Sequence, residues 1–144
     1  MNIAVINLQH KIPVPVSKIK SAARRALREF GDTHRNPNSG IQYNFNSVYG
    51  ECPQIHIVFV GPKRMRRINA KYLGHDYVTD VIAFDHGEII VCPQMAVGNA
   101  RIYGNTVEKE IILYAIHGIL HLAGYEDKTP QGVRRMRAKE QEFM

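Results

Sequence analysis

The sequence has no tryptophan, only two cysteines and no long uninterrupted apolar run. Cys52 and Cys92 lie far apart and form no C-x-x-C pattern, so neither a disulfide framework nor a zinc knuckle is indicated. No stretch approaches the roughly 18 apolar residues that would suggest a membrane span. The first residues, MNIAVINLQHK, lack a basic start and a long apolar segment, so we expect no signal peptide. These absences predict a soluble, cytoplasmic protein.

What is present describes a folded chain of ordinary size. Its 144 residues suit one domain with its own core. The composition, 44% apolar and 22% charged, is that of a globular rather than a disordered protein. Lys and Arg number 19 against 13 Asp and Glu, which gives a net charge of +6. A polyanion such as nucleic acid is therefore a candidate partner, although many basic proteins bind none.

The first part of the chain combines short β-branched runs with amphipathic helices. IAVINL and QIHIVFVG are typical of strands, the second buried on both faces. Ser17 is a candidate N-cap for a helix over residues 18–30. Residues 62–73 predict a second helix, with a basic side and a stop at Gly74.

Residues 31–53 form a long polar connection, which we expect to be a surface excursion or a mobile loop. Within it, Ile41, Tyr43 and Phe45 alternate with polar residues, as in a half-buried strand. Tyr43, Phe45 and Tyr49 could also stack on unpaired bases, although core packing explains them better. The sequence leaves the role of this segment open.

The second part predicts a hairpin followed by helices. TDVIAF and EIIVC are strand-like runs joined by DHG, whose glycine suits a tight turn. Thr106 is a fair N-cap for a long apolar helix that runs to Gly124, with acidic residues in its first turns. A charged helix over residues 131–144 follows it.

Two histidines lie four residues apart near the end of the long helix. Positions i and i+4 share a helix face, so His117 and His121 can direct ring nitrogens at one ion. Gly124 can adopt the left-handed conformation and turn the chain back, which carries Asp127 toward the same face. Three protein ligands and an open position are typical of a catalytic rather than a structural zinc site. The alternative is a core helix with two hydrogen-bonded histidines, followed by an aspartate that caps the next helix.

The residue after the first histidine argues against one class of enzyme. Zinc peptidases of the H-E-x-x-H kind place a glutamate there as the general base. This sequence has Gly118 at that position. Hydrolysis of peptide bonds is therefore the weaker interpretation.

The segment HGILHLAGYED, residues 117–127, resembles the signature HGxLHLxGYDH of the YbeY family of bacterial rRNA maturation factors. Upstream, INAKYLGHDYVTDVIAFD resembles the family's N-x-x-Y-R-x-x-D-x-x-T-D-V-L-S-F, and GEIIVC resembles its next strand. The likeness covers roughly residues 55–142 in the same order, and the first 54 residues contribute little. It implies one α+β domain over residues 1–144, with a small mixed sheet, several helices and a metal site at the C-terminal end of a central helix.

The resemblance also implies an activity. Family members are described as metal-dependent endoribonucleases specific for single-stranded RNA, acting in 16S rRNA 3′-end maturation and ribosome quality control. By position, His117 and His121 match the first two zinc ligands, and the third falls on Asp127. The implied cofactor is one Zn²⁺ per chain. The implied partners are rRNA and the small ribosomal subunit, with ribosomal proteins and an assembly GTPase as further candidates.

Two positions depart from the family pattern. Asp127 replaces a histidine, and because a carboxylate is a normal zinc ligand we expect the ion to stay bound. The anionic ligand should weaken the pull on bound water and make Mn²⁺ or another harder ion more acceptable. Leu73 stands where the family has an arginine that could neutralise phosphate charge. His75 or Lys71 could take over that role.

Basic residues crowd two short segments, as phosphate-backbone binding requires. Each cluster alone is better explained as a solvated helix face, but a metal site between them in the chain favours an RNA groove. We expect the ion to polarise a phosphate oxygen and to lower the pKa of a water. The first cluster is Lys63, Arg64, Arg66, Arg67 and Lys71, and the second is Arg134, Arg135, Arg137 and Lys139. The candidate catalytic residues are Asp80, Asp85, Glu88 and His75.

Two other functions stay open at this point. A non-catalytic, metal-stabilised ribosome-assembly factor is the main alternative, favoured by Leu73. A metallopeptidase comes third because of Gly118. Removal of the ion discriminates the first two, since a structural ion would take stability with it.

Overall fold

A computed structural model describes residues 2–30, 34–35, 42–43 and 54–144. Strands and helices follow one another along the chain, largely where apolar periodicity predicts them. In chain order the elements are β1 (Asn2–Asn7), α1 (Val16–Phe30), β2 (His34–Arg35), β3 (Gln42–Tyr43), β4 (Gln54–Phe59), α3 (Pro62–Leu73), β5 (Val81–Phe84), β6 (Glu88–Val91), α4 (Gln94–Tyr103), α5 (Val107–Leu122) and α6 (Pro130–Phe143).

Four strands form a mixed sheet in the order β1-β4-β6-β5, and the short β2 and β3 pair with each other. Strands β1 and β6 both run parallel to β4, whereas β5 is antiparallel to β6. Gly87, at φ 97°, closes the predicted β5–β6 hairpin with a backbone conformation that side-chain-bearing residues rarely adopt. The described residues thus form a single α+β domain with five helices and a small mixed sheet, as predicted.

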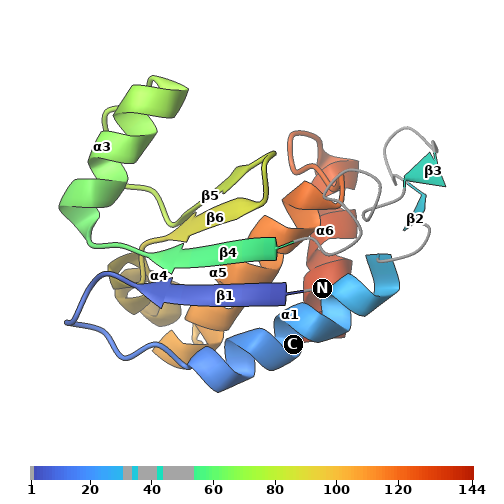
Figure 1. The fold of residues 1–144 in the computed structure, drawn as a ribbon, viewed down its shortest axis with the longest axis horizontal. Helices are drawn as coiled ribbons and strands as arrows, with labels where there is room; N and C mark the ends of the chain where they lie inside the picture. The colour runs from blue at the N-terminus through green and yellow to red at the C-terminus, as the bar shows by residue number, and fades with distance from the viewer. Residues whose placement is uncertain (1, 31–33, 36–41, 44–53) are drawn as a thin grey trace.

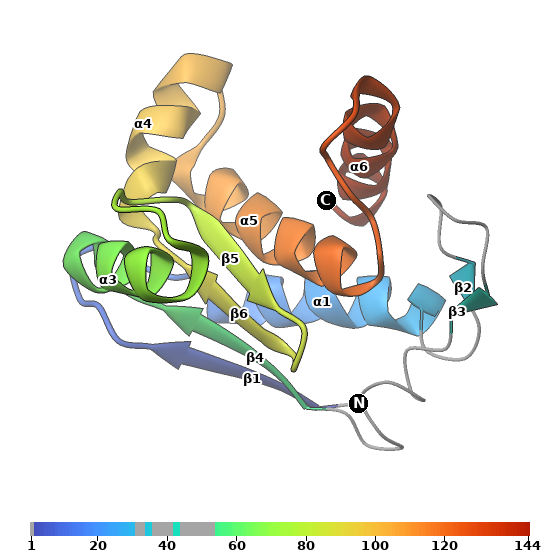
Figure 2. The same ribbon diagram turned by 90° about the horizontal axis from the view of Figure 1, so that it is seen from above.

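The sheet separates two apolar clusters because side chains alternate along its strands. Ile57, Phe59 and Ile89 point to the face that α1 and α5 cover, and this cluster is the larger one. On the opposite face, Val58 and other sheet residues pack with Met65 of α3. Figures 1 and 2 show α1 and α5 along one side of the sheet and α3 standing on the other.

Two local details differ from expectation. Helix α1 begins at Val16, so Ser17 lies inside its first turn rather than at the N-cap. Helix α4, Gln94–Tyr103, was not predicted, because Gly98 and Asn99 in its middle weaken the helical pattern. The apolar side predicted for α1 is confirmed: its buried residues are Ile19, Ala22, Ala23, Ala26, Leu27 and Phe30.

The described residues include one of the two cysteines. Cys92 is a buried free thiol. Among the helices of the described ranges, none has the length and apolar character needed to cross a bilayer. The alternation at Ile41, Tyr43 and Phe45, the stacking role considered for Tyr49, and Cys52 concern side chains outside the described residues.

Candidate metal centre

Helix α5 carries the two histidines, and both of its ends are defined by local interactions. Thr106 caps the start, its hydroxyl accepting a hydrogen bond from the backbone N–H of Lys109 at 3.1 Å. Gly124, at φ 95°, has the left-handed conformation expected just beyond the helix. Its N–H donates to the carbonyl of His121 at 3.0 Å. The chain then reverses and brings Asp127 alongside the histidines.

Three ligand atoms converge at this reversal. Nε2 of His117 lies 2.9 Å from Nε2 of His121. Oδ2 of Asp127 lies 3.4 Å from the former nitrogen and 3.7 Å from the latter. Donors about 2.0–2.1 Å from a tetrahedral ion are about 3.3 Å apart, so these separations fit one small divalent cation. The donor set of two imidazoles and one carboxylate therefore could hold a metal ion.

Glu140 of α6 supports the first histidine from behind. Nδ1 of His117 donates to Oε1 of Glu140 at 2.7 Å, and the Glu140 side chain is only 11% exposed. A carboxylate in this position fixes the ring orientation and leaves Nε2 free to bind an ion. Glu140 was not among the residues predicted from the sequence. Its one signal is an acidic residue on the apolar side of α6, in line with Gly132, Met136 and Phe143.

The two histidines have opposite pKa shifts. Burial opposes the charged form of His117, but the hydrogen bond and charge of Glu140, with the charge of Asp127, raise its pKa. Burial and the neighbouring His117 lower the pKa of His121. In the metal-free state the first proton taken up by this pair therefore resides on His117.

The loop that presents Asp127 is held by the start of α6. The Thr129 hydroxyl accepts a hydrogen bond from the N–H of Gly132 at 3.0 Å, which caps the helix. A Cβ atom on Gly132 would lie 2.5 Å from the carbonyl oxygen of Glu126. Only glycine allows the helix start and the loop to approach this closely, so Asp127 has a rigid support.

Gly118 faces the sheet rather than the candidate ligand group. A Cβ atom at this position would lie 2.5 Å from Cγ2 of Ile89 on β6. A glutamate here would have to enter the packed layer between α5 and the sheet. The geometry therefore agrees with the sequence argument against a peptidase of the H-E-x-x-H kind.

Two of the three candidate ligands, His117 and Asp127, line a cleft of about 500 Å³ between α4, α5, α6 and the start of β5. Figure 2 shows α4 and α6 on either side of α5. The charged lining consists of His117, the cation Arg137 and the acids Asp80, Glu110, Asp127 and Glu140. This excess of acids favours cations in the cleft, and any phosphate that enters needs a bound ion or outside cations to offset it.

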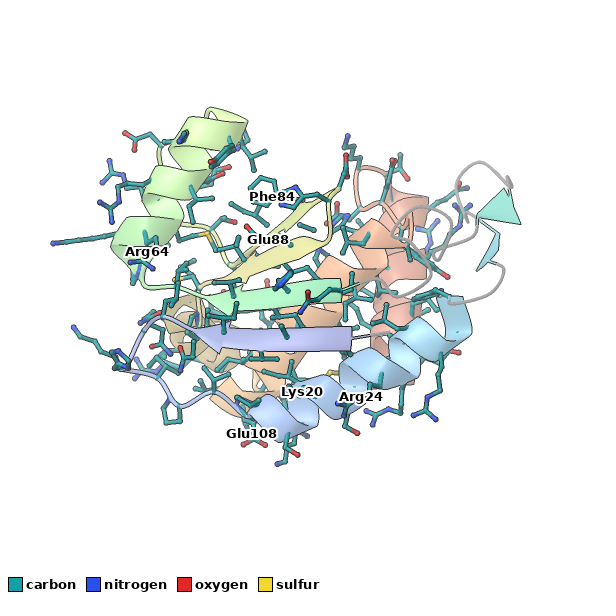
Figure 3. The ribbon with its side chains drawn as sticks, viewed as in Figure 1. Lys20, Arg24, Arg64, Phe84, Glu88 and Glu108 are labelled. Atoms are coloured by element: carbon teal, nitrogen blue, oxygen red, sulfur yellow. The ribbon has the colours of Figure 1, made fainter. Side chains whose placement is uncertain are left out.

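The candidate catalytic residues are found in different places. Asp80 lines the cleft, and its Oδ1 accepts a hydrogen bond from the N–H of Val81 at 2.8 Å. Asp85 lies in the β5–β6 turn and His75 in the loop after α3, and neither lines that cleft. Glu88 lies on the sheet face opposite α5, on the same side as Phe84 (Figure 3).

The two basic clusters are on different helices at a distance from one another. The first cluster is on α3 and the second on α6, and α5 lies between these helices in Figure 2. Arg66 pairs with Asp76, and Lys139 pairs with Glu29 and Glu142. Arg137 lines the cleft.

Comparisons with known proteins agree on one family. A sequence model of the family described as Endoribonuclease YbeY matches residues 4–144. Endoribonuclease YbeY of Elusimicrobium minutum is 33% identical over 139 residues, which are 88% of each chain. Endoribonuclease YbeY of Thermodesulfovibrio yellowstonii is 30% identical over 156 aligned residues, covering 100% of this chain and 96% of its own. The solution structure of a Thermotoga maritima protein matches with a TM-score of 0.57 at 27% identity, covering 98% of this chain and 85% of the other.

Proposed function

Because the chain belongs to the endoribonuclease YbeY family, we propose that it is a metal-dependent endoribonuclease specific for single-stranded RNA. Its role is maturation of the 16S rRNA 3′ end and ribosome quality control, and the whole of residues 1–144 acts as one domain. The observation that best supports this proposal is the convergence of His117, His121 and Asp127, of which the first and the last line an open cleft, with Glu140 behind His117.

The three converging residues are the metal ligands in this proposal. One Zn²⁺ per chain is the expected cofactor, and the carboxylate of Asp127 also makes Mn²⁺ acceptable. A divalent ion held there supplies Lewis acidity toward a phosphate oxygen and a water of lowered pKa. Asp127, at 43% side-chain exposure, is the most open of the three ligands. RNA can therefore approach from the side of the 123–129 loop.

Asp80 is the favoured general base among the four candidates. It lines the same cleft as His117, and its charge contributes to the raised pKa of that histidine. Hydrogen bonds to Oδ1 from the hydroxyl of Thr79 and the N–H of Val81 orient the carboxylate. Oδ2 then remains to accept a proton from the attacking hydroxyl group. Asp85, Glu88 and His75 remain weaker candidates because they do not line the cleft.

RNA phosphates bind to cations outside the acidic cleft. We assign this role to the basic cluster of α3, with Arg137 of α6 at the cleft itself. Exposed Leu73, at the end of α3, cannot neutralise phosphate charge as the family's arginine would. The expected partners are rRNA and the small ribosomal subunit in the cytoplasm, with ribosomal proteins and an assembly GTPase as further contacts.

The direct experiment is cleavage of a single-stranded precursor of the 16S rRNA 3′ end by wild type and by Asp127→Ala, purified identically. Loss of the third ligand should remove metal and cleavage together. Asp127→His restores the residue of the family pattern and should retain cleavage. Glu126→Ala, an exposed neighbour in the same loop, is the matched control and should cleave as wild type does. Cleavage by Asp127→Ala at the wild-type rate would contradict the assignment.

A second candidate function is a ribosome-assembly factor whose ion has only a structural role. Leu73 in place of the family's arginine is the observation that favours it. In that case neither wild type nor Asp127→His cleaves the precursor, although both bind metal. Leu73→Arg would then be expected to restore cleavage if the missing cation is the only defect.

A further inference from the structure

Five aromatic rings lie on the end of α3, on the loop that follows it and on the β5–β6 hairpin. Two of them, Tyr72 and Tyr77, are 59% and 55% exposed. An isolated exposed aromatic residue is ordinary, but several together beside cations indicate a binding surface. We call this group the aromatic shelf: Tyr72, His75, Tyr77, Phe84 and His86.

The rings of the shelf are arranged in nearly parallel pairs. His75 and Tyr77 stack with ring centroids 5.4 Å apart and planes 11° apart. Phe84 and His86 stack with centroids 5.5 Å apart and planes 16° apart. Tyr72 contacts Phe84 edge to face at 5.5 Å, which connects the helix to the hairpin. The exposed rings, Tyr72, His75, Tyr77 and His86, present π faces to which any unpaired base can stack, whereas Phe84 is half-buried and anchors the group.

The loop that carries His75 and Tyr77 is held in place before any ligand binds. The guanidinium of Arg66 donates two hydrogen bonds to the carboxylate of Asp76, at 2.8 and 3.2 Å. Asn69, buried to 1% exposure, donates from Nδ2 to the carbonyl of Tyr77 at 3.0 Å. Gly74, at φ 71°, ends α3 and starts the loop. Binding to a preorganised loop loses less conformational entropy than binding to a flexible one.

Cations flank the shelf along α3. Arg64, Arg67 and Lys71 follow one another at three- and four-residue spacing, so they form a ridge on one side of the helix. Among the described residues, no acid pairs with these three. The ammonium of Lys71 lies 5.2 Å from the centre of the Tyr72 ring. Asp76 is already neutralised by Arg66, and the acids facing the shelf from the hairpin are Asp85 and Glu88.

The shelf is also close to the metal-binding cleft along the chain. Asp80, which lines the cleft, follows Tyr77 after two residues. Their Cα atoms are therefore at most about 11 Å apart. Because β5 is the edge strand of the sheet, an RNA strand that stacks on the shelf can reach the cleft by passing around this edge at Tyr77 and Asp80.

From these features we propose that the aromatic shelf binds unpaired bases of single-stranded RNA while the Arg64, Arg67 and Lys71 ridge binds its phosphates. This inference rests on the proposed function and adds to it the surface that selects single strands. Bases in a duplex are already stacked on each other, so their faces cannot reach the rings. A protein partner would need an acidic, apolar surface, and it is the competing outcome of the test.

The test is equilibrium binding of a fluorescent single-stranded RNA of about 12 nucleotides, measured by anisotropy with a chelator present so that no cleavage occurs. Tyr77→Leu keeps apolar bulk but removes the ring, and it should weaken binding about tenfold. Tyr77→Phe keeps the ring and should bind as wild type does. The slope of log affinity against log salt should be unchanged in both variants, because no phosphate contact is lost.

The ridge is tested by its salt dependence. Arg67→Ala should weaken binding and reduce the salt slope by about 0.7, the value for one phosphate contact on a single strand. The matched control is Arg24→Ala, an exposed cation on α1, which lies on the opposite face of the sheet (Figure 3) and should leave both quantities unchanged. A duplex of the same sequence should bind tenfold or more weakly than the single strand.

Measuring RNA binding and RNA cleavage separately distinguishes the shelf proposal from the nuclease proposal. Equal affinity of Tyr77→Leu and wild type, or of duplex and single strand, would overturn the shelf proposal even if the enzyme cleaves RNA. Shelf-dependent binding without any cleavage by wild type supplied with Zn²⁺ or Mn²⁺ would support the shelf and contradict the nuclease proposal. Loss of RNA binding in Arg24→Ala equal to that in Arg67→Ala would show general electrostatic attraction instead.

Discussion

Glu140 determines which nitrogen of His117 faces the metal-binding group. Its carboxylate can only accept a hydrogen bond at neutral pH, so Nδ1 of His117 must be the donor, at 2.7 Å. In the neutral ring, Nε2 then carries the lone pair and points toward His121 and Asp127. One buried acid thus sets the tautomer, the orientation and the basicity of a candidate ligand.

We predict that Glu140→Ala lowers metal affinity by about 10- to 100-fold, because the ligand loses its support. Glu140→Gln retains an acceptor but removes the negative charge that raises the pKa of His117. Metal competes with protons for this ring, so the pH below which affinity falls should be lower in Glu140→Gln than in wild type. Competition with a chromophoric chelator, repeated from about pH 5 to 8, measures both effects.

Glu142→Ala is the matched control for this experiment. Glu142 lies on the same helix but is exposed and pairs with Lys139 rather than with the metal-binding group. Its affinity and pH profile should be those of wild type. Unchanged affinity in Glu140→Ala would mean that the hydrogen bond to His117 has no effect on the ion.

Helix α5, which carries the two histidines, approaches the sheet closely. Gly118 is the contact point, since even a methyl group there would meet Ile89 of β6. Gly98 of α4 is the opposite case, with open space around its Cα. Alanine substitutions at these two glycines therefore test different quantities, packing against the sheet at Gly118 and helix propensity at Gly98.

We predict that Gly118→Ala destabilises the fold by about 1–2 kcal/mol, because overpacking outweighs the gain in helix propensity. Gly98→Ala should instead stabilise it by about 0.5–1 kcal/mol. Urea unfolding followed by circular dichroism measures the free energy of unfolding of both variants. A stabilised Gly118→Ala would show that α5 can move away from β6 without loss.

Features of these elements that depend on local interactions could be predicted from the sequence. Helix α5 and its limits were predictable because Thr106 and Gly124 act through local backbone geometry. The ligand group followed from the four-residue spacing of the histidines and from that glycine. Helix α4 was not predictable because tertiary packing outweighs the poor helix propensity of Gly98 and Asn99.

Features that depend on contacts between distant elements could not be predicted from the sequence. Glu140 meets His117 only because α6 packs across α5, 23 residues farther along the chain. The cleft exists because α4 and α6 flank α5, and neither arrangement leaves a periodic signal in the sequence. The 59% exposure of Tyr72 likewise depends on how α3 packs on the sheet, which helical spacing does not reveal.

Across the whole molecule, charge is distributed unevenly. The chain carries a net +6, yet the cleft beside the candidate metal ligands is lined by four acids and one arginine. The larger apolar cluster lies between the sheet, α1 and α5, and it does not depend on the ligand group. Folding and metal binding should therefore be only loosely coupled.

We predict that chelation leaves a folded protein with a lower melting temperature. An ion present at 100 times its dissociation constant adds about 2.7 kcal/mol to stability, which corresponds to about 10 °C for a chain of this size. The thermal transition should stay cooperative, and the far-ultraviolet circular dichroism of the native state should not change. Asp127→Ala is the control, since its melting temperature should not respond to the chelator.

Unfolding on chelation at ambient temperature would contradict this prediction. It would assign the ion a structural role and favour the assembly-factor function. Loss of cleavage with the native spectrum retained would instead agree with a catalytic ion.

The order of the elements along the chain affects how the protein is synthesised. Helix α1 ends at Phe30, but α5, against which its apolar side packs, begins only at Val107. The backbone groups of β1 can likewise pair only after β4 has been synthesised. On the ribosome, the first segments therefore leave the exit tunnel with an uncovered apolar surface that persists until most of the chain has been translated. Nascent-chain chaperones bind surfaces of this kind, so this protein should need their help early in its own synthesis.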